Sequence, residues 1–277
     1  MSGSARAAAS PAAAAKPARG AAPAPRASRG IQSIEVGGQL LVGLVHLGRP
    51  VPLKDLAQAA GMTPAKAHPY LVSFCKLGLI QQDAGSGHYG LGPLALQAGL
   101  ISMQQVDPIR LAGAELPRLA EAIGHTVGLA IWGNRGPTFV RLAEGPSAVH
   151  VNMRHGTVVS VFGTASGRLF AAFVAREDVL AALRAETGRA SARIEAGLAD
   201  ELARIRKQGF AGLKDGTIPG ISAIAAPVFD GFGTMVASLT AIGPGATLDA
   251  SIRGGAARTL IDTAARLSAR LGARPAA

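Results

Sequence analysis

The chain has 277 residues, which is room for two domains, and 48% of them are hydrophobic, enough for a sizeable core. Its 28 Lys and Arg outnumber its 17 Asp and Glu, and the net charge of +11 makes nucleic acid the first partner to consider and an anionic membrane surface the second. A single cysteine, Cys75, excludes an internal disulfide framework and most thiolate metal sites, and no apolar run reaches the roughly 18 residues of a membrane-spanning helix. We therefore expect a cytoplasmic protein that holds no metal or cofactor and enters no membrane.

The first thirty residues carry nearly half of the surplus positive charge. They hold five basic residues and no acidic one, whereas residues 31–93 hold four basic and three acidic residues. With thirteen Ala, four Pro and no aromatic residue, residues 1–30 bury too little surface to offset the entropy of ordering. We predict a disordered basic tail, in which Arg26 and Arg29 contact the DNA backbone or minor groove; a tail that only aids solubility is the alternative.

Residues 31–93 have the pattern of three helices followed by a hairpin. Apolar residues at helical spacing begin near Ile31, where Ser33 can cap a helix that ends before Pro50. The further elements are a short helix over 53–60, a turn at 61–63, a helix to Leu77, and strands at 79–82 and 88–91. This order predicts a winged helix-turn-helix, whose third helix enters the major groove of DNA.

The outward side of that third helix supplies the candidate DNA contacts. Its polar side chains can reach phosphates or base edges, and Thr63 can also cap the helix. A polar residue on an exposed helix face is also commonly just solvated, so the helix as a whole is a firmer prediction than any one of its residues. With the tail, the candidate DNA-binding residues are Arg29, Thr63, Lys66, His68, Tyr70 and Ser73.

The remainder of the chain divides into an apolar linker helix over 94–106 and a domain over 107–277. Asp107-Pro108 breaks the linker, and a second helix runs to about Ile123. Alternating patterns then predict strands near 126–132, 137–143, 148–154, 221–229 and 234–242, and helices over 164–175, 191–208 and 249–271. Clustered strands flanked by helices indicate an α+β domain with an antiparallel sheet.

Four stretches together resemble the IclR family of bacterial transcriptional regulators. They are IQSIEVGGQLL at the first helix, LAQAAGMTPAKAHPYLVSFCKLGLI with HYGLGP through the wing, GTASGRLFAAF at 163–173, and GISAIAAPVFDGFGTMVASLTAIGP at 220–244. The resemblance covers about 240 residues and implies a GAF-like ligand-binding domain, pairing of the DNA-binding halves through the linker, and a homodimer or tetramer on a pseudo-palindromic operator. It also implies that a small organic or aromatic acid is bound by Thr164, Ala165, Ala223, Thr240 and Ile242, with Asp215 in a lid.

The chain departs from the family pattern within the recognition helix. Where the family usually has a Ser-Thr pair and a His-Arg pair, this sequence has Ala65-Lys66 and His68-Pro69. The missing Arg removes a typical phosphate or guanine ligand, and Pro69 removes a backbone donor. We therefore expect a helix that either starts later than the family pattern suggests or is kinked.

The second domain favours ligand binding over catalysis. It has no G-x-S-x-G, G-x-x-x-x-G-K, H-E-x-x-H or G-x-G-x-x-G motif, and Ser166 has no evident His partner. Helix-opening residues 163–166 present free N–H groups that favour a carboxylate, and Arg141, Arg154 and Arg168 are candidate counter-ions. The family often places polar residues at positions 223 and 242. Ala223 and Ile242 make the pocket less polar, which suggests an aromatic or branched ligand.

We therefore predict a regulator whose DNA binding is modulated by a small carboxylate. A ligand can do this only if it binds two states of the protein with different affinity. Two other readings stay open: a metabolite-binding protein or small-molecule enzyme with a degenerate helix-turn-helix, and a basic protein that binds DNA without specificity.

Overall fold

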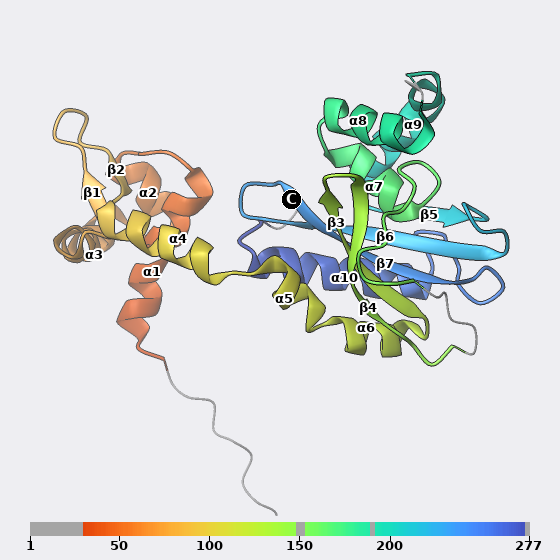
Figure 1. The fold of residues 1–277 in the computed structure, drawn as a ribbon. Coiled ribbons are helices and arrows are strands. Elements are labelled where there is room, and N and C mark those ends of the chain that lie inside the picture. The colour runs from red at the N-terminus through yellow and green to blue at the C-terminus, as the bar shows by residue number, and fades with distance from the viewer. Residues whose placement is uncertain (1–29, 148–152, 189–191, 275–277) are drawn as a thin grey trace, which may run out of the picture. The chain divides into compact units, whose positions relative to one another are not determined.

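The computed structural model describes residues 30–147, 153–188 and 192–274 (Figure 1). The chain divides into two compact units between Gly99 and Leu100, inside the segment predicted as a linker helix. The predicted tail, with Arg26 and Arg29, and residues 148–152 of one predicted strand lie outside the described residues.

The first unit has the predicted order of three helices and a hairpin. Its elements are α1 (Gln32–Leu47), α2 (Leu53–Ala59), α3 (Pro64–Leu77), β1 (Ile80–Gln82) and β2 (Tyr89–Leu91). The two strands pair antiparallel, and Val51 forms an isolated bridge to Tyr89 at the edge of the hairpin. Apolar side chains of all three helices meet in one core, among them Leu40, Leu56 and Leu71, each fully buried.

Two local expectations in this unit are corrected by the structure. Helix α1 starts one residue before Ser33, its N-cap is Ile31, and no side chain caps it. Helix α3 does not start late: Thr63 caps it, Pro64 is its first residue, and the helix continues through Pro69 to Leu77. Of the two alternatives the late start is therefore wrong, and a kink at Pro69 stays a prediction, because Pro69 lacks the N–H that would bond to the carbonyl of Ala65 and its ring crowds that carbonyl.

Helix α4 (Pro93–Gln105) follows β2 directly and contains no buried residue. Its large apolar side chains include Leu96, Leu100, Ile101 and Met103, each of which is more than half exposed. The predicted linker helix is therefore present, and its apolar surface is not covered within the described chain.

The second unit is built on a five-stranded antiparallel sheet in the order β4-β3-β7-β6-β5 (Figure 1). The strands are β3 (Thr126–Gly133), β4 (Gly136–Ala143), β5 (Ala211–Lys214), β6 (Ile221–Phe229) and β7 (Met235–Pro244). Helices α5 (Pro108–Gly113), α6 (Leu116–Ile123) and α10 (Gly255–Arg270) pack on one face. Helices α7 (Ala165–Phe173), α8 (Arg176–Thr187) and α9 (Ala192–Gln208) cover the other.

Side chains alternate between the two faces along the central strands. In β6, Ile224 and Ala226 face the core under α10, whereas Ala223 and Ala225 face α7. This alternation is the period of two that strand geometry imposes, and it decides which residues of β6 and β7 can line a site next to α7.

The predicted outline of this unit is confirmed as α+β, with several differences in detail. The helix predicted to end at Ile123 is two helices, α5 and α6, and the closing helix begins at Gly255 instead of residue 249. Helix α8 and the four-residue edge strand β5 were not predicted. Met153 and Arg154, the described end of the strand predicted at 148–154, belong to no strand.

Candidate functional site

The exposed surface of α3 is the candidate nucleic-acid interface. Thr63, Lys66, His68 and Ser73 are all exposed, as predicted for residues that contact DNA. Thr63 also caps the helix, since its Oγ1 accepts a hydrogen bond from the N–H of Lys66 at 3.4 Å. The capping role is confirmed; the DNA contacts stay predictions.

Tyr70 differs from these residues because its ring packs inside the unit. It is half-buried, and the ring lies so close to Gly37 of α1 that a Cβ there would be 2.7 Å from Cδ1 of Tyr70. A glycine at position 37 is therefore what lets α3 approach α1. Through this contact Tyr70 orients the recognition helix. A DNA contact of its hydroxyl group stays a prediction.

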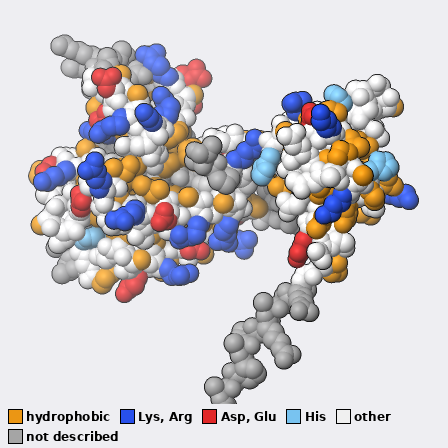
Figure 2. Space-filling view, turned by 180° about the vertical axis from the view of Figure 1, so that it is seen from behind, with side chains coloured by type: hydrophobic (Ala, Val, Ile, Leu, Met, Phe, Trp, Pro, Cys, Tyr) orange, Lys and Arg blue, Asp and Glu red, His pale blue; other side chains and the backbone are white. Residues whose placement is uncertain are grey.

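The faces of α3 can be separated by helix geometry. At about 100° per residue, Lys66 and Ser73 lie roughly 20° apart on the exposed side, whereas His68 lies at its edge near the buried stripe. The centre of the exposed side is held by Ala65, Pro69, Val72 and Lys76. In the face that Figure 2 shows, Lys and Arg side chains are scattered over the first unit among hydrophobic ones.

The wing between β1 and β2 is stabilised by its own acidic residue. The carboxylate of Asp83 accepts hydrogen bonds from the N–H and the O–H of Ser86, both at 2.7 Å. These bonds, the O–H first, hold the pKa of Asp83 below its usual value. The turn is thus fixed by an ionised side chain at neutral pH.

In the second unit, a cavity of about 300 Å³ lies between the start of α7 and the sheet. Five of the six predicted effector-binding residues line it: Thr164, Ala165, Ala223, Thr240 and Ile242. Gly163 and Ser166, named from the sequence as helix-opening residues, also line it. The further lining residues were not selected from the sequence: Phe139, Met153, Thr157, Val158, Val159, Ser160, Leu213, Gly216, Thr217, Ile218 and Ile221.

The N-terminus of α7 forms the polar end of this cavity. Thr164 caps the helix: its Oγ1 accepts from the N–H of Gly167 at 3.1 Å and donates to the carbonyl of Ser160 at 2.7 Å. The N–H groups of Ala165 and Ser166 precede the first intrahelical hydrogen bond, so the helix itself leaves them without an acceptor. Both residues are almost fully buried and line the cavity.

A chain of hydroxyl groups continues from α7 onto β7. Ser166 Oγ lies 2.9 Å from Thr240 Oγ1, which in turn lies 3.0 Å from Ser238 Oγ. All three residues are buried, and the hydroxyl groups satisfy one another. Ser166 is therefore hydrogen-bonded to a threonine and not to a histidine, which is consistent with the expectation that it is no nucleophile.

The segment from Asp215 to Gly220 supplies three residues of the cavity lining, Gly216, Thr217 and Ile218, and hydrogen bonds fix it at two places. Asp215 lies outside the lining, and its φ of 53° is the positive φ found at a non-glycine residue among the described residues. Its Oδ1 accepts from the N–H of Gly220 at 2.7 Å. Thr217 donates through its N–H, at 3.1 Å, and its hydroxyl group, at 2.9 Å, to the carbonyl of Gly163.

The three candidate arginine counter-ions do not line the cavity. Nη1 of Arg168 contacts both carboxylate oxygens of Glu201 at 2.8 Å, and Nε donates to the carbonyl of Phe162 at 2.7 Å. Arg141 and Arg154 are exposed. No Lys, Arg or His is among the described residues that line the cavity, so the expectation of an arginine partner is wrong. Arg168 instead joins α7 to α9 and holds the loop before Thr164.

Sequence reasoning missed the two loop residues that fix the cavity's polar end. Ser160 accepts from the N–H of Gly163 at 2.9 Å, and Thr217 binds the carbonyl of the same glycine. Ser160 lies four residues before the N-cap Thr164, whose hydroxyl group donates to the carbonyl of Ser160, so the position of the cap was the available local signal. Thr217 is 54 residues from Gly163, and no local pattern links the two.

No group of three or more His, Cys, Asp or Glu side chains in residues 30–147, 153–188 and 192–274 is placed to hold a metal ion. Over the same residues, no helix has both the length and the apolar character needed to cross a membrane.

A winged helix-turn-helix joined to a separate domain with a small-molecule cavity defines a transcription regulator that has a DNA-binding and an effector unit. Family comparisons agree: the IclR helix-turn-helix domain matches residues 33–84, and the C-terminal domain of bacterial transcriptional regulator IclR matches residues 101–269. The chain belongs to the IclR family of bacterial transcriptional regulators. It is a DNA-binding regulator and not an enzyme. The alternative hypothesis of a small-molecule enzyme with a degenerate helix-turn-helix is therefore wrong.

Individual relatives extend over most of the chain. The crystal structure of HmgR from Pseudomonas aeruginosa has a TM-score of 0.79 and 36% identity, covering 89% of this chain and all of that one. The regulator BhcR of Paracoccus denitrificans is 26% identical and covers 78% of this chain and 79% of its own length. The transcriptional repressor IclR of Escherichia coli is 24% identical, covering 77% and 80%.

Proposed function

We propose that the cavity at the start of α7 binds a small carboxylate with an aromatic or branched apolar part, and that this ligand changes the affinity of the protein for its operator. The observation that carries the proposal is that Ala165 and Ser166, the first two residues of α7, are buried and line the cavity, while the helix offers their N–H groups no acceptor. A carboxylate satisfies both, and the positive end of the helix dipole favours it.

The walls of the cavity support the apolar half of this ligand. Phe139, Ala223 and Ile242 offer only hydrocarbon surface, and the hydroxyl groups of Ser166 and Thr240 are engaged with each other. A volume of about 300 Å³ is at the lower end of the range for small-molecule sites, which favours a ligand of one ring or a short branched chain.

On the DNA side, we propose that α3 enters the major groove with Lys66 and Ser73 toward the phosphates or bases, while Thr63 and His68 contact the flanks. The apolar surface of α4 supports pairing of two chains, and a homodimer or tetramer then reads a pseudo-palindromic operator. A difference of about 1–3 kcal/mol in ligand affinity between the two states is enough to switch operator occupancy.

The first experiment tests the ligand class by calorimetry on the full chain. Benzoate and isobutyrate should bind, whereas benzyl alcohol and isobutanol, which keep the apolar part but lack the carboxylate, should bind at least tenfold more weakly. Thr164→Val should weaken benzoate because it removes the cap that orients the N–H groups. Thr247→Val, an exposed threonine outside the cavity, is the matched control. Equal binding of benzoate and benzyl alcohol would refute the carboxylate site.

The second experiment tests the coupling to DNA. A gel shift with the region upstream of the gene should show a specific complex that changes when a bound carboxylate is added. Random duplex of the same length is the control, because equal affinity for both would favour binding without specificity. A complex that is specific but insensitive to every carboxylate found to bind would contradict the proposed coupling.

A further inference from the structure

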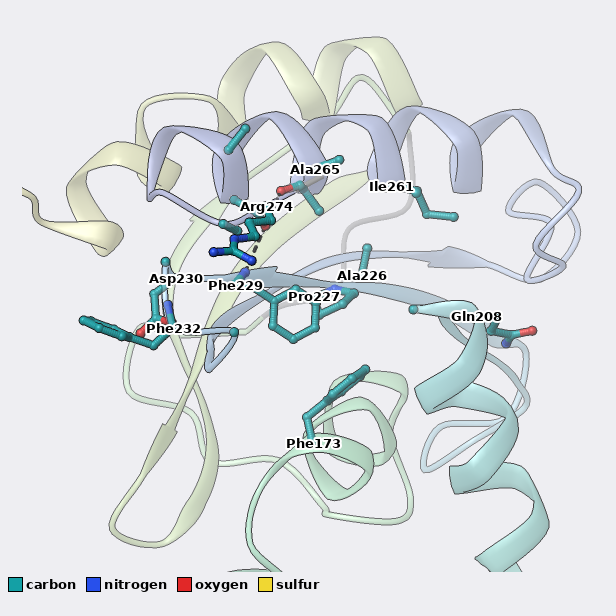
Figure 3. A pocket seen from close by; sticks show the side chains of 17 residues that line it. Phe173, Gln208, Ala226, Pro227, Phe229, Asp230, Phe232, Ile261, Ala265 and Arg274 are labelled. Atoms are coloured by element: carbon teal, nitrogen blue, oxygen red, sulfur yellow. Dashed lines mark hydrogen bonds between the residues drawn. The ribbon is translucent and has the colours of Figure 1, made fainter. Parts of the chain in front are cut away.

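A second hollow lies on the effector unit and shares no lining residue with the cavity at α7 (Figure 3). It is an open groove of about 1010 Å³ between the end of α7, the end of β6 and the side of α10. Phe173 and Phe229 meet edge to face in it, with ring centroids 5.2 Å apart, and Ile261 and Ala265 of α10 lie opposite them. The surface of the groove is mainly hydrocarbon.

The floor of the groove is a stretch of strand edge that is protected against strand addition. β5 pairs with β6 only as far as Ala211 and Ala225, so residues 226–229 of β6 pair with β7 on one side and have no strand on the other side among the described residues. Pro227 has no N–H to offer, and the N–H of Phe229 already donates to Ser268 Oγ at 2.9 Å. The groove is therefore suited to receive side chains and not another strand.

The turn that ends the groove carries the most exposed large hydrophobic side chain of the described residues, Phe232, at 78%. The turn is rigid: Asp230 Oδ1 accepts from the N–H groups of Phe232 and Thr234, each at 2.9 Å. Gly233 supplies the positive φ, 80°, that the turn needs. The backbone that carries Phe232 is thus already ordered, which lowers the entropic cost of placing its side chain in a binding site.

We propose that this groove binds Phe232 of a second copy of the chain, in a two-fold arrangement in which each copy inserts its Phe232 into the groove of the other. Phe232 itself lines one end of the groove, and a side chain that projects from the rim of a groove can enter the same groove of a second copy while a two-fold axis satisfies both halves at once. The two phenylalanines bury roughly 150–250 Å² each. The ionisable residues of the groove, Asp230 and Arg274, have opposite charge, so two copies meet without net repulsion.

This contact is separate from the apolar surface of α4 and needs neither the effector nor the operator. If the α4 surface and the Phe232 groove each pair two chains, the two contacts together assemble a tetramer. Either contact alone assembles only a dimer. The groove and Phe232 both lie within the effector unit, so the interface forms between effector units.

The test is sedimentation velocity of the full chain over a range of concentrations, in the wild type and in a Leu100→Glu background that removes an apolar residue of α4. In that background, Phe232→Ser and Ala265→Glu should each raise the dissociation constant of the remaining dimer at least tenfold. Ile252→Ser, an exposed apolar residue outside the groove, should leave it unchanged. Both Phe232 and Ala265 are exposed, so an unchanged melting temperature shows that folding is intact.

A cross-linking experiment checks the geometry. In a Cys75→Ser background, Phe232→Cys and Ala265→Cys chains are mixed and oxidised, and a disulfide-linked heterodimer should form only in the mixture. Unchanged association in Phe232→Ser would overturn the proposal. So would a loss in Phe232→Ser without a loss in Ala265→Glu, or the absence of the mixed disulfide, because the groove would then not be where Phe232 binds.

Discussion

Helices α4 and α7 are both apolar, and they have opposite relations to the rest of the chain. Seven of the nine residues of α7 are buried, and its backbone runs against the loop at Ser160. None of the thirteen residues of α4 is buried. The difference shows that an apolar sequence predicts that a helix will be covered, but does not predict which surface will cover it. The apolar residues of α7 are buried inside its own unit, whereas those of α4 require a surface outside the described chain.

Phe170 and Leu100 test this difference most strongly. Phe170→Ala, which empties a fully buried site in α7, should lower the free energy of unfolding by about 3–5 kcal/mol. Leu100→Ala in α4, at a side chain that is 53% exposed, should change it by under about 1 kcal/mol in dilute protein. Urea unfolding of both variants measures the contrast, and similar losses would show that α4 is packed within its own chain.

The glycines of the two helices sharpen the same contrast. A Cβ at Gly167 of α7 would lie among the carbonyl groups of Ser160 and Val161, so Gly167→Ala should destabilise the protein by about 1–3 kcal/mol. A Cβ at Gly99 of α4 meets nothing within 4 Å, and Gly99→Ala should stabilise it by about 0.5–1 kcal/mol. Opposite shifts of the melting temperature are expected, and shifts of one sign would contradict the comparison.

Self-association should respond to α4 and not to α7. Leu100→Glu places a charge on the apolar surface and should raise the dissociation constant for pairing of two chains at least tenfold, without lowering the melting temperature of the effector unit. Glu35→Gln on α1, a change of charge away from α4, is the control. Sedimentation equilibrium measures the constant, and an unchanged value would remove α4 from the pairing surface.

The smallest effect concerns a polar turn in each unit. The O–H and N–H of Ser86 hold the pKa of Asp83 below its usual value, and Ser251 does the same for Asp249. Because the folded-state pKa of Asp83 lies below the unfolded one, its contribution to stability is complete above the unfolded pKa and is lost as the pH falls through the folded pKa. Ser86→Ala should raise the pKa of Asp83 in an NMR titration, whereas Ser251→Ala should leave it unchanged. A pKa of Asp83 that stays low in Ser86→Ala would contradict the assignment.

Helix boundaries were predictable wherever the sequence contains residues that cap or end a helix. Thr63 with Pro64 and Gly78 frame α3, and Asp107 with Pro108 starts α5, so these boundaries follow from local chemistry. Helix α8 was missed because its start at Arg176 has no side-chain cap, and β5 because four residues are too short for a clear alternation. Ser33 was predicted as a cap, but the helix begins one residue earlier.

The lining of the cavity was predictable only in part, because some of its contacts depend on residues far apart in the sequence. The family resemblance supplied the predicted lining residues, and the structure adds the reason: strand alternation puts Ala223 on the face next to α7, and Thr164 caps that helix. Arg168 was misassigned because its partner, Glu201, is 33 residues away on a helix that only the fold brings near. Pairings of that kind depend on the packing of α7 against α9, which no local pattern contains.

The close approach at Gly167 has a consequence for how this cavity can change over evolution. The carbonyl groups of Ser160 and Val161 lie where any side chain at position 167 would have to go, so the packing of α7 against the loop at Ser160, a residue that lines the cavity, requires a glycine at this position. Ala223 and Ile242 contribute only side-chain atoms to the wall. A lineage can therefore exchange these two residues and change the shape of the cavity wall while the packing of α7 against its preceding loop is inherited intact.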